Sequence, residues 1–521
     1  MDTQRSFVER LVRVREAAGR WASLSLARKI ELLCACRDAT GRVAGAWTAC
    51  AAALKGVSRT PAAGEEAITG PWAVMATLNR YVLTLREIER FGAPRFERRA
   101  TRVRPDGRTV ARVFPEGGYD RLLLPGVRGE VWTRDSTLST LPADSRPTVT
   151  LVLGAGNVTS IGPLDALYAI VAEGSACVLK LHPLLDDLAP TVQEALAPLI
   201  AEGALTLERG DAAVGRRLVA DPLVDRVHVT GSFATYESIL AEAGPRKRVT
   251  GELGNVTPTI VMPDRWSDAD FAAAATNIAS AKLHNGGFNC VAPQVLILPR
   301  RWAGRSTLLG HLERRLREAP ARPAYYPGAA ERFARLLGGR VPRAVVEVAY
   351  EDVCEPLFRE EAFCALLAAV ALPGDDAESY LTNAVSFVNE RLAGDLAVNL
   401  IVRSPARCGG ALDNAVAELR YGCVSVNAWS GVAFMLPQLP WGAYRGEDRK
   451  PRGSGCGVVH NSRLLAQTQK CALYAPFSPF PKPPWYLTNR NRAAIGAALC
   501  DFELTRSAAA FAKVALLAVT G

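Results

Sequence analysis

The segment NGGFNC at 285–290 sets Cys290 directly after a glycine-rich turn, and this pattern makes the cysteine a candidate nucleophile. A cysteine attacks as its thiolate, so it needs nearby backbone amides to hold the developing negative charge and a base for any later hydrolysis. Glu252, in the upstream segment GELG, is the candidate base. Taken alone, a free cysteine is more often a small buried hydrophobe, so the interpretation depends on the elements around it.

The composition is typical of a globular protein with two or three domains. The chain has 521 residues, of which 49% are hydrophobic and 22% charged. Its 12 cysteines are scattered, so reduced thiols are expected in place of a disulfide scaffold. No CxxC pair or histidine-rich cluster has the spacing of zinc ligands, and we predict no metal site.

The charge pattern argues against binding of nucleic acid. The formal net charge of +10 is spread along the chain, and the denser arginine patch at 90–104 lacks interleaved aromatic residues. A solvated face or a subunit contact is therefore the favoured interpretation of this patch, and we expect no nucleic-acid binding. The N-terminus is charged and no run of 18 uncharged apolar residues occurs, so we expect no membrane span and a cytoplasmic location.

The pattern of the first half predicts an α/β fold. Residues 1–91 are typical of helices, whereas 92–146 contain short β-like runs, which we expect to form two or three strands outside the main sheet. From TVTLVL to PTIVM, residues 147–262 alternate strands and helices, which predicts a parallel sheet covered on both faces. We assign 1–91 and 147–262 to a dinucleotide-binding domain and 92–146 to a β-rich oligomerisation segment.

The second half repeats the alternation, which predicts a second doubly wound α/β domain. Residues 263–460 form this catalytic domain, which carries Cys290. Residues 461–521 comprise a C-terminal strand, a Pro-rich linker and a helical tail with one final helix. The apolar tail is too short to cross a bilayer, so we expect it to pack on the body or on another subunit. The charged insertion at 446–452 has no assigned role.

A standard dinucleotide fingerprint is absent from the first strand–helix–strand unit. No GxGxxG motif with an acidic residue about twenty positions later occurs there. Other features near the predicted strand ends are suited to an anionic ligand. These are Lys180 at a strand end, the turn RGDAAVG ending at Gly215, and Gly231 with Ser232 opening a helix.

Together these pieces resemble the aldehyde dehydrogenase superfamily in order and spacing over roughly 130–465. The motifs are GAGN at 154–157, Lys180, HVTGSFAT at 228–235, GELGNVTP at 251–258, NGGFNC at 285–290 and REEAF at 359–363, followed by GCVSVN and PWGAY. The resemblance implies that Cys290 is the nucleophile, Glu252 the general base and Asn157 an amide donor to the oxyanion. It also implies that Glu361 holds the nicotinamide ribose with Phe363 beside the ring. The full set predicted to bind NAD or NADP is Lys180, Gly215, Gly231, Ser232, Glu361 and Phe363.

The reaction implied by the resemblance is oxidation of an aldehyde to a carboxylic acid. Cys290 would form a thiohemiacetal and then a thioester, which water activated by Glu252 would hydrolyse without a metal. The aromatic residues Trp429, Phe434 and Trp441, with Met435, lie near the late loop and favour an apolar or aromatic aldehyde. The resemblance also implies a homodimer or homotetramer.

Three departures from the family pattern keep other interpretations open. Phe288 stands where glutamine is common, and Asn255 replaces a glycine. Pro183 stands where NAD-preferring members often carry a ribose-binding glutamate, so both NAD and NADP stay open as the cofactor. The GAGNV turn resembles acyl-CoA reductases, which makes an acyl-CoA reductase or CoA-acylating aldehyde dehydrogenase one alternative, although the retained Glu252 argues against it. A second alternative is a catalytically silent aldehyde-dehydrogenase-like structural or binding protein.

Overall fold

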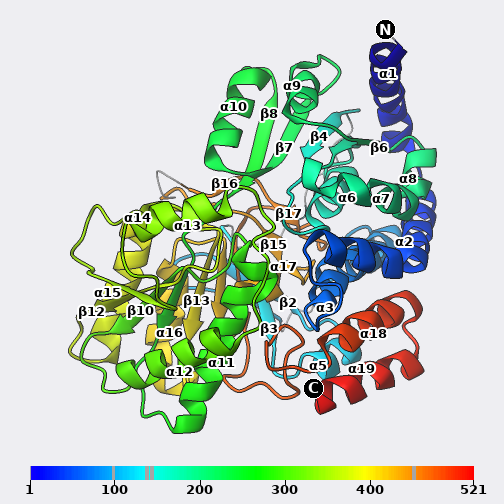
Figure 1. Cartoon of the computed structure of the whole chain (residues 1–521). Helices are drawn as coiled ribbons and strands as arrows, with labels where there is room; N and C mark the ends of the chain where they lie inside the picture. Colours follow the sequence, from blue (N-terminus) through cyan, green and yellow to red (C-terminus); the bar gives the residue numbers. More distant parts are fainter. Residues whose placement is uncertain (1, 97–99, 135–139, 141–145, 449–452) are drawn as a thin grey trace.

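Two large sheets form the frame of the molecule (Figure 1). The computed structural model describes residues 2–96, 100–134, 140, 146–448 and 453–521. Within these residues, one sheet has six strands and the other ten, with a small two-stranded ribbon of β15 (Pro440–Trp441) and β17 (Val459–His460). Helices cover both large sheets, which confirms the predicted α/β fold with two α/β units.

The N-terminal region is helical, as predicted, and packs on the six-stranded sheet. Its helices are α1 (Asp2–Ser23), α2 (Leu26–Leu54), α3 (Ala63–Ala67), a π-helical turn (Ile68–Trp72) and α4 (Ala73–Phe91). Trp21 and Trp47 are buried in the core that these helices share with the sheet. Their indole N–H groups donate to the Ile170 carbonyl and the Thr159 hydroxyl, each at 2.9 Å, so both buried polar groups are satisfied.

The six-stranded sheet has the order β16-β8-β7-β4-β5-β6. Its parallel strands are β4 (Val149–Leu153), β5 (Ala176–Lys180), β6 (Leu205–Glu208), β7 (Arg226–Gly231) and β8 (Arg248–Leu253). The short strand β16 (Gly455–Cys456) adds to β8 in the antiparallel direction. The strand order reverses at β4, and in such sheets ligands bind at the carboxyl ends beside the reversal.

Helices cover both faces of this sheet. They are α6 (Ile161–Val171), α7 (Ala189–Ala195), α8 (Ala197–Ala201), α9 (Ala212–Ala220) and α10 (Phe233–Ala243). Side chains of α1 also contribute to the core cluster that contains Leu151 and Val178. Parallel strands buried on both faces explain why these segments are continuously apolar in sequence.

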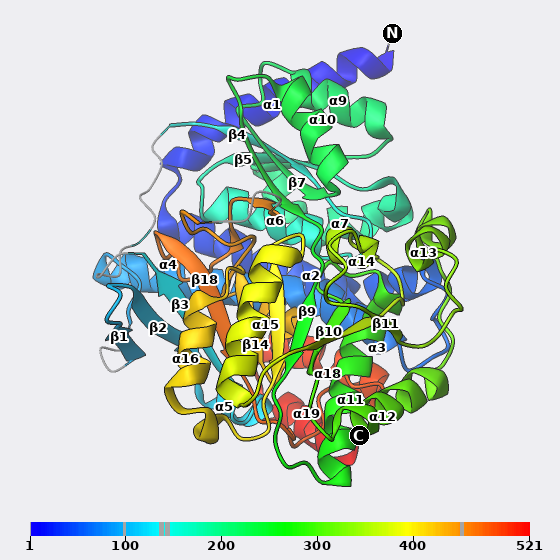
Figure 2. The same cartoon turned by 90° about the vertical axis from the view of Figure 1, so that its left-hand side faces the viewer.

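The ten-stranded sheet has the order β1-β2-β3-β18-β14-β13-β9-β10-β12-β11. Its parallel part comprises β9 (Pro258–Val261), β10 (Val295–Pro299), β11 (Val346–Val348), β12 (Ala368–Leu372), β13 (Ala397–Ile401), β14 (Cys423–Val426) and β18 (Thr468–Tyr474). The accompanying helices include α11 (Asp268–Leu283), α12 (Arg305–Glu318), α13 (Ala329–Leu337), α15 (Ala377–Arg391) and α16 (Gly409–Glu418). Figure 2 shows α15 and α16 covering one face of this sheet.

Two predictions about sheet membership were wrong. The strand predicted to end the first sheet, β9, lies instead between β10 and β13 of the larger sheet. All four of its residues are buried, and an apolar run of this length fits either sheet equally well. The strands β1 (Thr101–Val103), β2 (Thr109–Phe114) and β3 (Arg128–Thr133) were predicted to lie outside the main sheet, but β3 pairs with β18 and extends the ten-stranded sheet. Residues 97–99, 135–139 and 141–145 of that segment lie outside the described part.

The C-terminal tail packs on the body of the molecule, as one of the two predicted alternatives (Figure 1). It contains two helices, α18 (Arg492–Thr505) and α19 (Ala508–Thr520), where a single final helix was predicted. The break falls at Arg506, which has a left-handed φ of 49° and is followed by the α19 cap Ser507. Helix α18 approaches α3 so closely that a Cβ at Gly64 would lie 2.2 Å from the Arg492 carbonyl oxygen. In the described residues, no helix is long and apolar enough to cross a membrane.

Candidate active site

Cys290 and Glu252 come together from the two sheets. Cys290 lies in the loop after α11, and Glu252 is near the end of β8. The Cys290 Sγ lies 3.5 Å from the Glu252 Oε1, within the distance of a hydrogen bond involving sulfur. Glu252 is 3% exposed, while Cys290 is half-buried. The predicted nucleophile and base are therefore in direct contact.

The loop that carries Cys290 has a backbone that most residues would not adopt. Asn285, Gly286 and Gly287 have φ values of 53°, 67° and 82°. A Cβ at Gly287 would lie 2.7 Å from the carbonyl of Cys364, so this position requires glycine. The Asn285 amide donates to the carbonyls of Asn157 at 2.9 Å and of Phe288 at 2.8 Å, which fixes the turn from within.

The electrostatics of the pair keep the thiol protonated until a base removes its proton. Burial raises the pKa of Glu252 to about 7, although the Trp441 indole and the Cys290 thiol partly offset this rise. Burial, followed by the charges of Glu252 and Glu361, raises the pKa of Cys290 well above its ordinary value. At neutral pH, Cys290 is thus a thiol beside a carboxyl group that is close to half ionised.

Asn157 lies close to the cysteine loop. It follows β4, is buried, and its side-chain amide donates to the Phe288 carbonyl at 3.1 Å. This bond uses one of the two amide hydrogens. Asn157 also lines the same cavity as Cys290 and Glu252, so the three predicted catalytic residues share one site.

A cavity of about 500 Å³ lies at the carboxyl ends of β7 and β8. Among the residues predicted to bind the cofactor, Gly231, Ser232, Glu361 and Phe363 line this cavity. Gly231 ends β7, and Ser232 caps α10 by accepting a hydrogen bond from the Thr235 N–H at 3.2 Å. The first turn of α10 therefore faces the cavity, and backbone N–H groups of this kind bind anions.

The two other predicted cofactor residues do not line this cavity. Lys180 is the last residue of β5 and is buried, which lowers the pKa of its ammonium group. Gly215 lies within α9, so the turn predicted to end there was placed too late. Asp211 begins that helix by accepting from the N–H groups of Ala213 and Val214, and this cap sets the earlier boundary.

Glu361 and Phe363 follow the short helix α14 (Pro356–Arg359). The Glu361 carboxylate accepts from the Asn255 backbone N–H at 3.3 Å, and burial raises the pKa of Glu361 to about 7. A Cβ at Gly254 would lie 2.5 Å from Glu361 Oε2, so the small residue allows the carboxylate to approach β8. The Arg332 guanidinium lies 5.9 Å from the Phe363 ring centroid. The wall of the cavity thus combines an acidic group, an aromatic ring and a cation.

Glu65 of α3, which no sequence motif marks, is buried beneath the loop that carries Cys290. Its carboxylate accepts from the Asn285 backbone N–H at 3.0 Å, from Arg322 in two hydrogen bonds, and from Arg492 at 3.2 Å. Burial alone would raise the pKa of Glu65, but His284, Arg322 and the Asn285 N–H lower it to about 2. His284 has a pKa of about 4 because it is buried, so at neutral pH the two arginines supply the positive charge.

A second group of this kind, Tyr325, lies on the other side of the loop. Its hydroxyl hydrogen-bonds with the Asn157 carbonyl at 3.2 Å and with the Asn285 side-chain oxygen at 3.1 Å. Lys55 lies 5.6 Å from the Tyr325 ring centroid and forms a buried ion pair with Glu66 at 2.8 Å. These side chains come from parts of the chain far from Cys290, and no local motif marks them.

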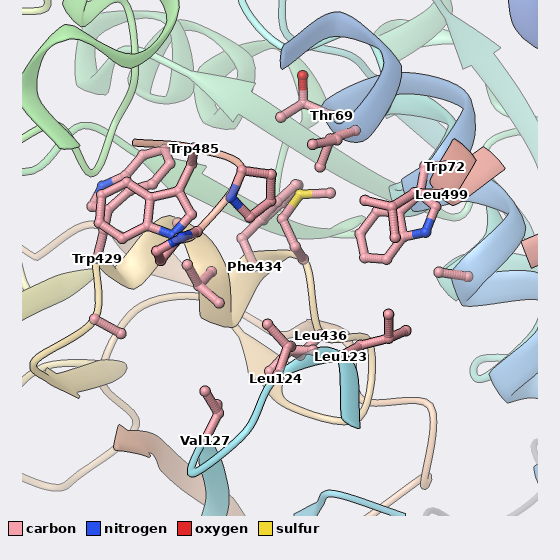
Figure 3. Close-up of a pocket in the computed structure, with 18 of the residues that line it drawn as sticks. Thr69, Trp72, Leu123, Leu124, Val127, Trp429, Phe434, Leu436, Trp485 and Leu499 are labelled. Carbon is pink, nitrogen blue, oxygen red and sulfur yellow. The ribbon is translucent and has the colours of Figure 1, made fainter. Parts of the chain in front are cut away.

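A second cavity, of about 450 Å³, meets the first at Cys290 and Glu252 (Figure 3). Cys290, Glu252 and Ile161 line both cavities. Trp429, Phe434, Met435 and Trp441, the residues predicted to favour an apolar ligand, all line the second one. The thiol therefore lies between a polar cavity and an apolar cavity. Among the described residues, no group of three histidines, cysteines or carboxylates is arranged to hold a metal ion.

Comparison with protein-family models matches residues 147–319 to the aldehyde dehydrogenase family. The chain is 34% identical over 143 residues to coniferyl aldehyde dehydrogenase of a Pseudomonas strain, covering 27% of this chain and 28% of that protein. It is 24% identical over 358 residues to the dimeric NADP-preferring aldehyde dehydrogenase of mouse, covering 64% of this chain and 72% of that protein. The match to coniferyl aldehyde dehydrogenase thus spans less than a third of that protein's length.

Solved structures with the same fold cover most of the chain. An NAD-dependent aldehyde dehydrogenase from Sinorhizobium meliloti aligns with a TM-score of 0.62 and 18% identity, over 91% of this chain and 87% of that one. Aldehyde dehydrogenase C from Pseudomonas syringae, solved as a mutant in complex with NAD+ and octanal, aligns with a TM-score of 0.59 and 18% identity. That alignment covers 90% of this chain and 88% of the other. At this identity the likeness establishes the fold.

The contacts of Glu65 predict that it positions the catalytic loop. A Glu65→Gln substitution would leave Arg322 and Arg492 without their buried counter-charge, a change that costs roughly 3–5 kcal/mol in comparable sites. We expect a lower urea midpoint and slower alkylation of Cys290 by iodoacetamide. Glu202→Gln is the matched control, because Glu202 pairs with Arg28 at the surface. An unchanged midpoint and alkylation rate in Glu65→Gln would refute the positioning role.

Proposed function

The chain belongs to the aldehyde dehydrogenase superfamily, and from that premise we propose that it oxidises an aldehyde to a carboxylic acid with NAD+ or NADP+. The observation that carries the proposal is the contact between Cys290 and Glu252 at the junction of the two cavities. A nucleophile at that point is open to substrate from the apolar side and to a cofactor from the polar side. A homodimer or homotetramer stays a prediction.

The first step would transfer the Cys290 thiol proton to Glu252. The sulfur then attacks the aldehyde carbon, and the carbonyl electrons move to the oxygen to form a thiohemiacetal oxyanion. The Asn157 amide and the Cys290 backbone N–H would hold this oxyanion. Loss of a hydride from the same carbon restores the carbonyl as a thioester.

The second half of the reaction would free the enzyme. Glu252 first releases the thiol proton to solvent and then accepts a proton from water as that water attacks the thioester carbon. The carbon–sulfur bond breaks, and the carboxylic acid leaves with Cys290 regenerated. Because burial raises the pKa of Glu252 to about 7, the group can both accept and release protons near neutral pH.

The polar cavity fits a nicotinamide dinucleotide, which accepts the hydride when bound. The N-terminal turn of α10 would hold the pyrophosphate through Gly231 and Ser232, and Glu361 would bind ribose hydroxyls. Lys180 at the end of β5 and Gly215 in the first turn of α9 would contribute from outside the lining of this cavity. Three arginines, Arg332, Arg335 and Arg359, also line the cavity on the side of Glu361 and Phe363, where they offset the acidic wall.

The first test is an assay of NAD+ and NADP+ reduction with a panel of aldehydes, with and without coenzyme A. We expect reduction without coenzyme A and its loss in Cys290→Ala. Strict dependence on coenzyme A would favour the acyl-CoA reductase or CoA-acylating alternative. Failure to bind either cofactor, together with a Cys290 that iodoacetamide labels no faster than the other cysteines, would favour the catalytically silent alternative.

Glu252 should govern both turnover and pH dependence. Glu252→Gln lacks both the acceptor of the thiol proton and the base for hydrolysis, so it should give a slow single burst of reduced cofactor and then stall as the acyl-enzyme. The exposed control Glu242→Gln should turn over normally. In the unsubstituted protein, a base with a pKa of about 7 is protonated as the pH falls, so kcat should decrease about fivefold from pH 7 to pH 6 and about tenfold for each further pH unit below. Wild-type turnover by Glu252→Gln would remove this residue from the role of base.

Removal of the Asn157 amide should slow formation of the thiohemiacetal. Loss of one oxyanion donor typically costs about 10²–10³ in kcat, and we expect Asn157→Ala to fall in this range. Asn383→Ala, on the exposed face of α15, serves as the control. A kcat for Asn157→Ala within twofold of the control would contradict the oxyanion role.

A further inference from the structure

The apolar cavity that begins at Cys290 extends to the C-terminal tail. Figure 3 shows Trp429 and Trp485 on one side of this cavity, Trp72 and Leu499 on the other, and Phe434 between them. Helices α18 and α19 form much of the outer wall. Their lining residues include Ile495, Leu499, Phe502, Phe511, Val514, Ala515, Ala518 and Val519. The tail therefore encloses space that is continuous with the nucleophile.

The outer end of the cavity opens at an apolar rim. Leu122, Phe480 and Val519 line the cavity and yet are 62%, 71% and 55% exposed. They come from α5 (Gly118–Leu123), the Pro-rich segment and α19. Large exposed apolar side chains around an opening are typical of an entrance for an apolar ligand.

The charged side chains of this wall already have partners. Arg80 binds Asp120 at 2.6 Å, Arg506 pairs with Glu503, and Lys482 donates to the carbonyls of Thr488 and Gly521. Glu65 is likewise held by Arg322 and Arg492. In the described part of the cavity wall, the arginines are thus paired with carboxylates and the Lys482 ammonium is held by two carbonyls, so an anionic aldehyde would have to displace one of these contacts to gain a counter-charge.

Resting on the aldehyde oxidation proposed above, we infer that the substrate is an aldehyde with a long unbranched apolar chain and that α18 and α19 form the wall against which its distal half packs. The aldehyde carbon must reach Cys290, so the chain of a bound substrate extends outward through the cavity. A cavity of about 450 Å³ is well above the needs of a short aldehyde and lies in the range of pockets that enclose drug-sized ligands. Each further methylene leaves water for an apolar wall, which favours binding by up to about fourfold.

A chain-length series tests the substrate class. We expect kcat/KM to rise from butanal through octanal to dodecanal by up to about fourfold per methylene, and then to level off when the cavity is filled. Succinic semialdehyde, which carries a carboxylate, should be poor. A flat series, or a preference for the anionic aldehyde, would overturn the inference while leaving aldehyde oxidation intact.

The role of the tail is tested by filling the outer half of the cavity. Ala515→Trp places a large side chain in the lining of α19, and Ala518→Trp does so one turn later. We expect either change to lower kcat/KM for dodecanal at least tenfold and to leave butanal within twofold. Ala509→Trp, on the exposed face of the same helix and outside the lining, should alter neither. Equal losses for both aldehydes, or no loss for dodecanal, would refute the assignment.

A binding measurement separates this inference from the proposed chemistry. Trp72, Trp429 and Trp485 line the cavity, so dodecanamide, which has the chain but no aldehyde, should change the tryptophan fluorescence of the full chain. We expect saturable binding that is weakened at least tenfold by Ala515→Trp and is unaffected by Ala509→Trp, which lies outside the lining. Such binding without any aldehyde oxidation would sink the proposed function but support the cavity as a site for long apolar chains. Absence of binding would overturn the inference.

Discussion

The position of Cys290, the proposed nucleophile, depends on one buried carboxylate, that of Glu65. The loop that ends at Cys290 contains three successive residues with left-handed backbone, so its local conformation is not one that the chain favours by itself. Glu65 holds the first of them, Asn285, by its backbone N–H. Burial of this charge is tolerated because Arg322 and Arg492 neutralise it. The entropic cost of ordering this glycine-rich loop is therefore offset by an ion cluster outside it.

The same cluster links the two sides of the proposed substrate site. Glu65 belongs to α3, Arg322 follows α12, and Arg492 begins α18, the helix that lines the apolar cavity. A shift of α18 would move Arg492, which shares the carboxylate that holds Asn285. The wall that would contact the substrate chain and the loop that would attack the aldehyde thus have a common anchor. A substrate chain that displaced α18 would therefore also shift Cys290, because direct contacts join the two.

Much of the fold could be predicted because buried parallel strands are continuously apolar and the helices between them have clear ends. Ser267, for example, is a residue type that favours helix starts, and its side chain caps α11. The sheet to which β9 belongs could not be predicted, since its four buried residues fit either sheet. Contacts across long sequence separations could not be predicted for a similar reason. Only the tertiary structure brings Glu65, Tyr325 and the tail helices to the site. A local motif marks the proposed catalytic residues, whereas the residues that position them, such as Glu65 and Tyr325, have no sequence motif.

The charges around Cys290 would make the reactivity of this buried thiol depend on what occupies the cavity. Glu252 and Glu361 lie near the thiol, and burial raises the pKa of each carboxyl to about 7. Each negative charge on Glu252, Glu361 or Cys290 raises the pKa of the other two groups. The site therefore disfavours more than one or two negative charges at a time. A positive charge entering the cavity beside Glu361 would lower all three pKa values together. The thiolate would then be favoured when an oxidised, positively charged nicotinamide is present and disfavoured when the cavity holds none, which would protect Cys290 from reaction without a hydride acceptor.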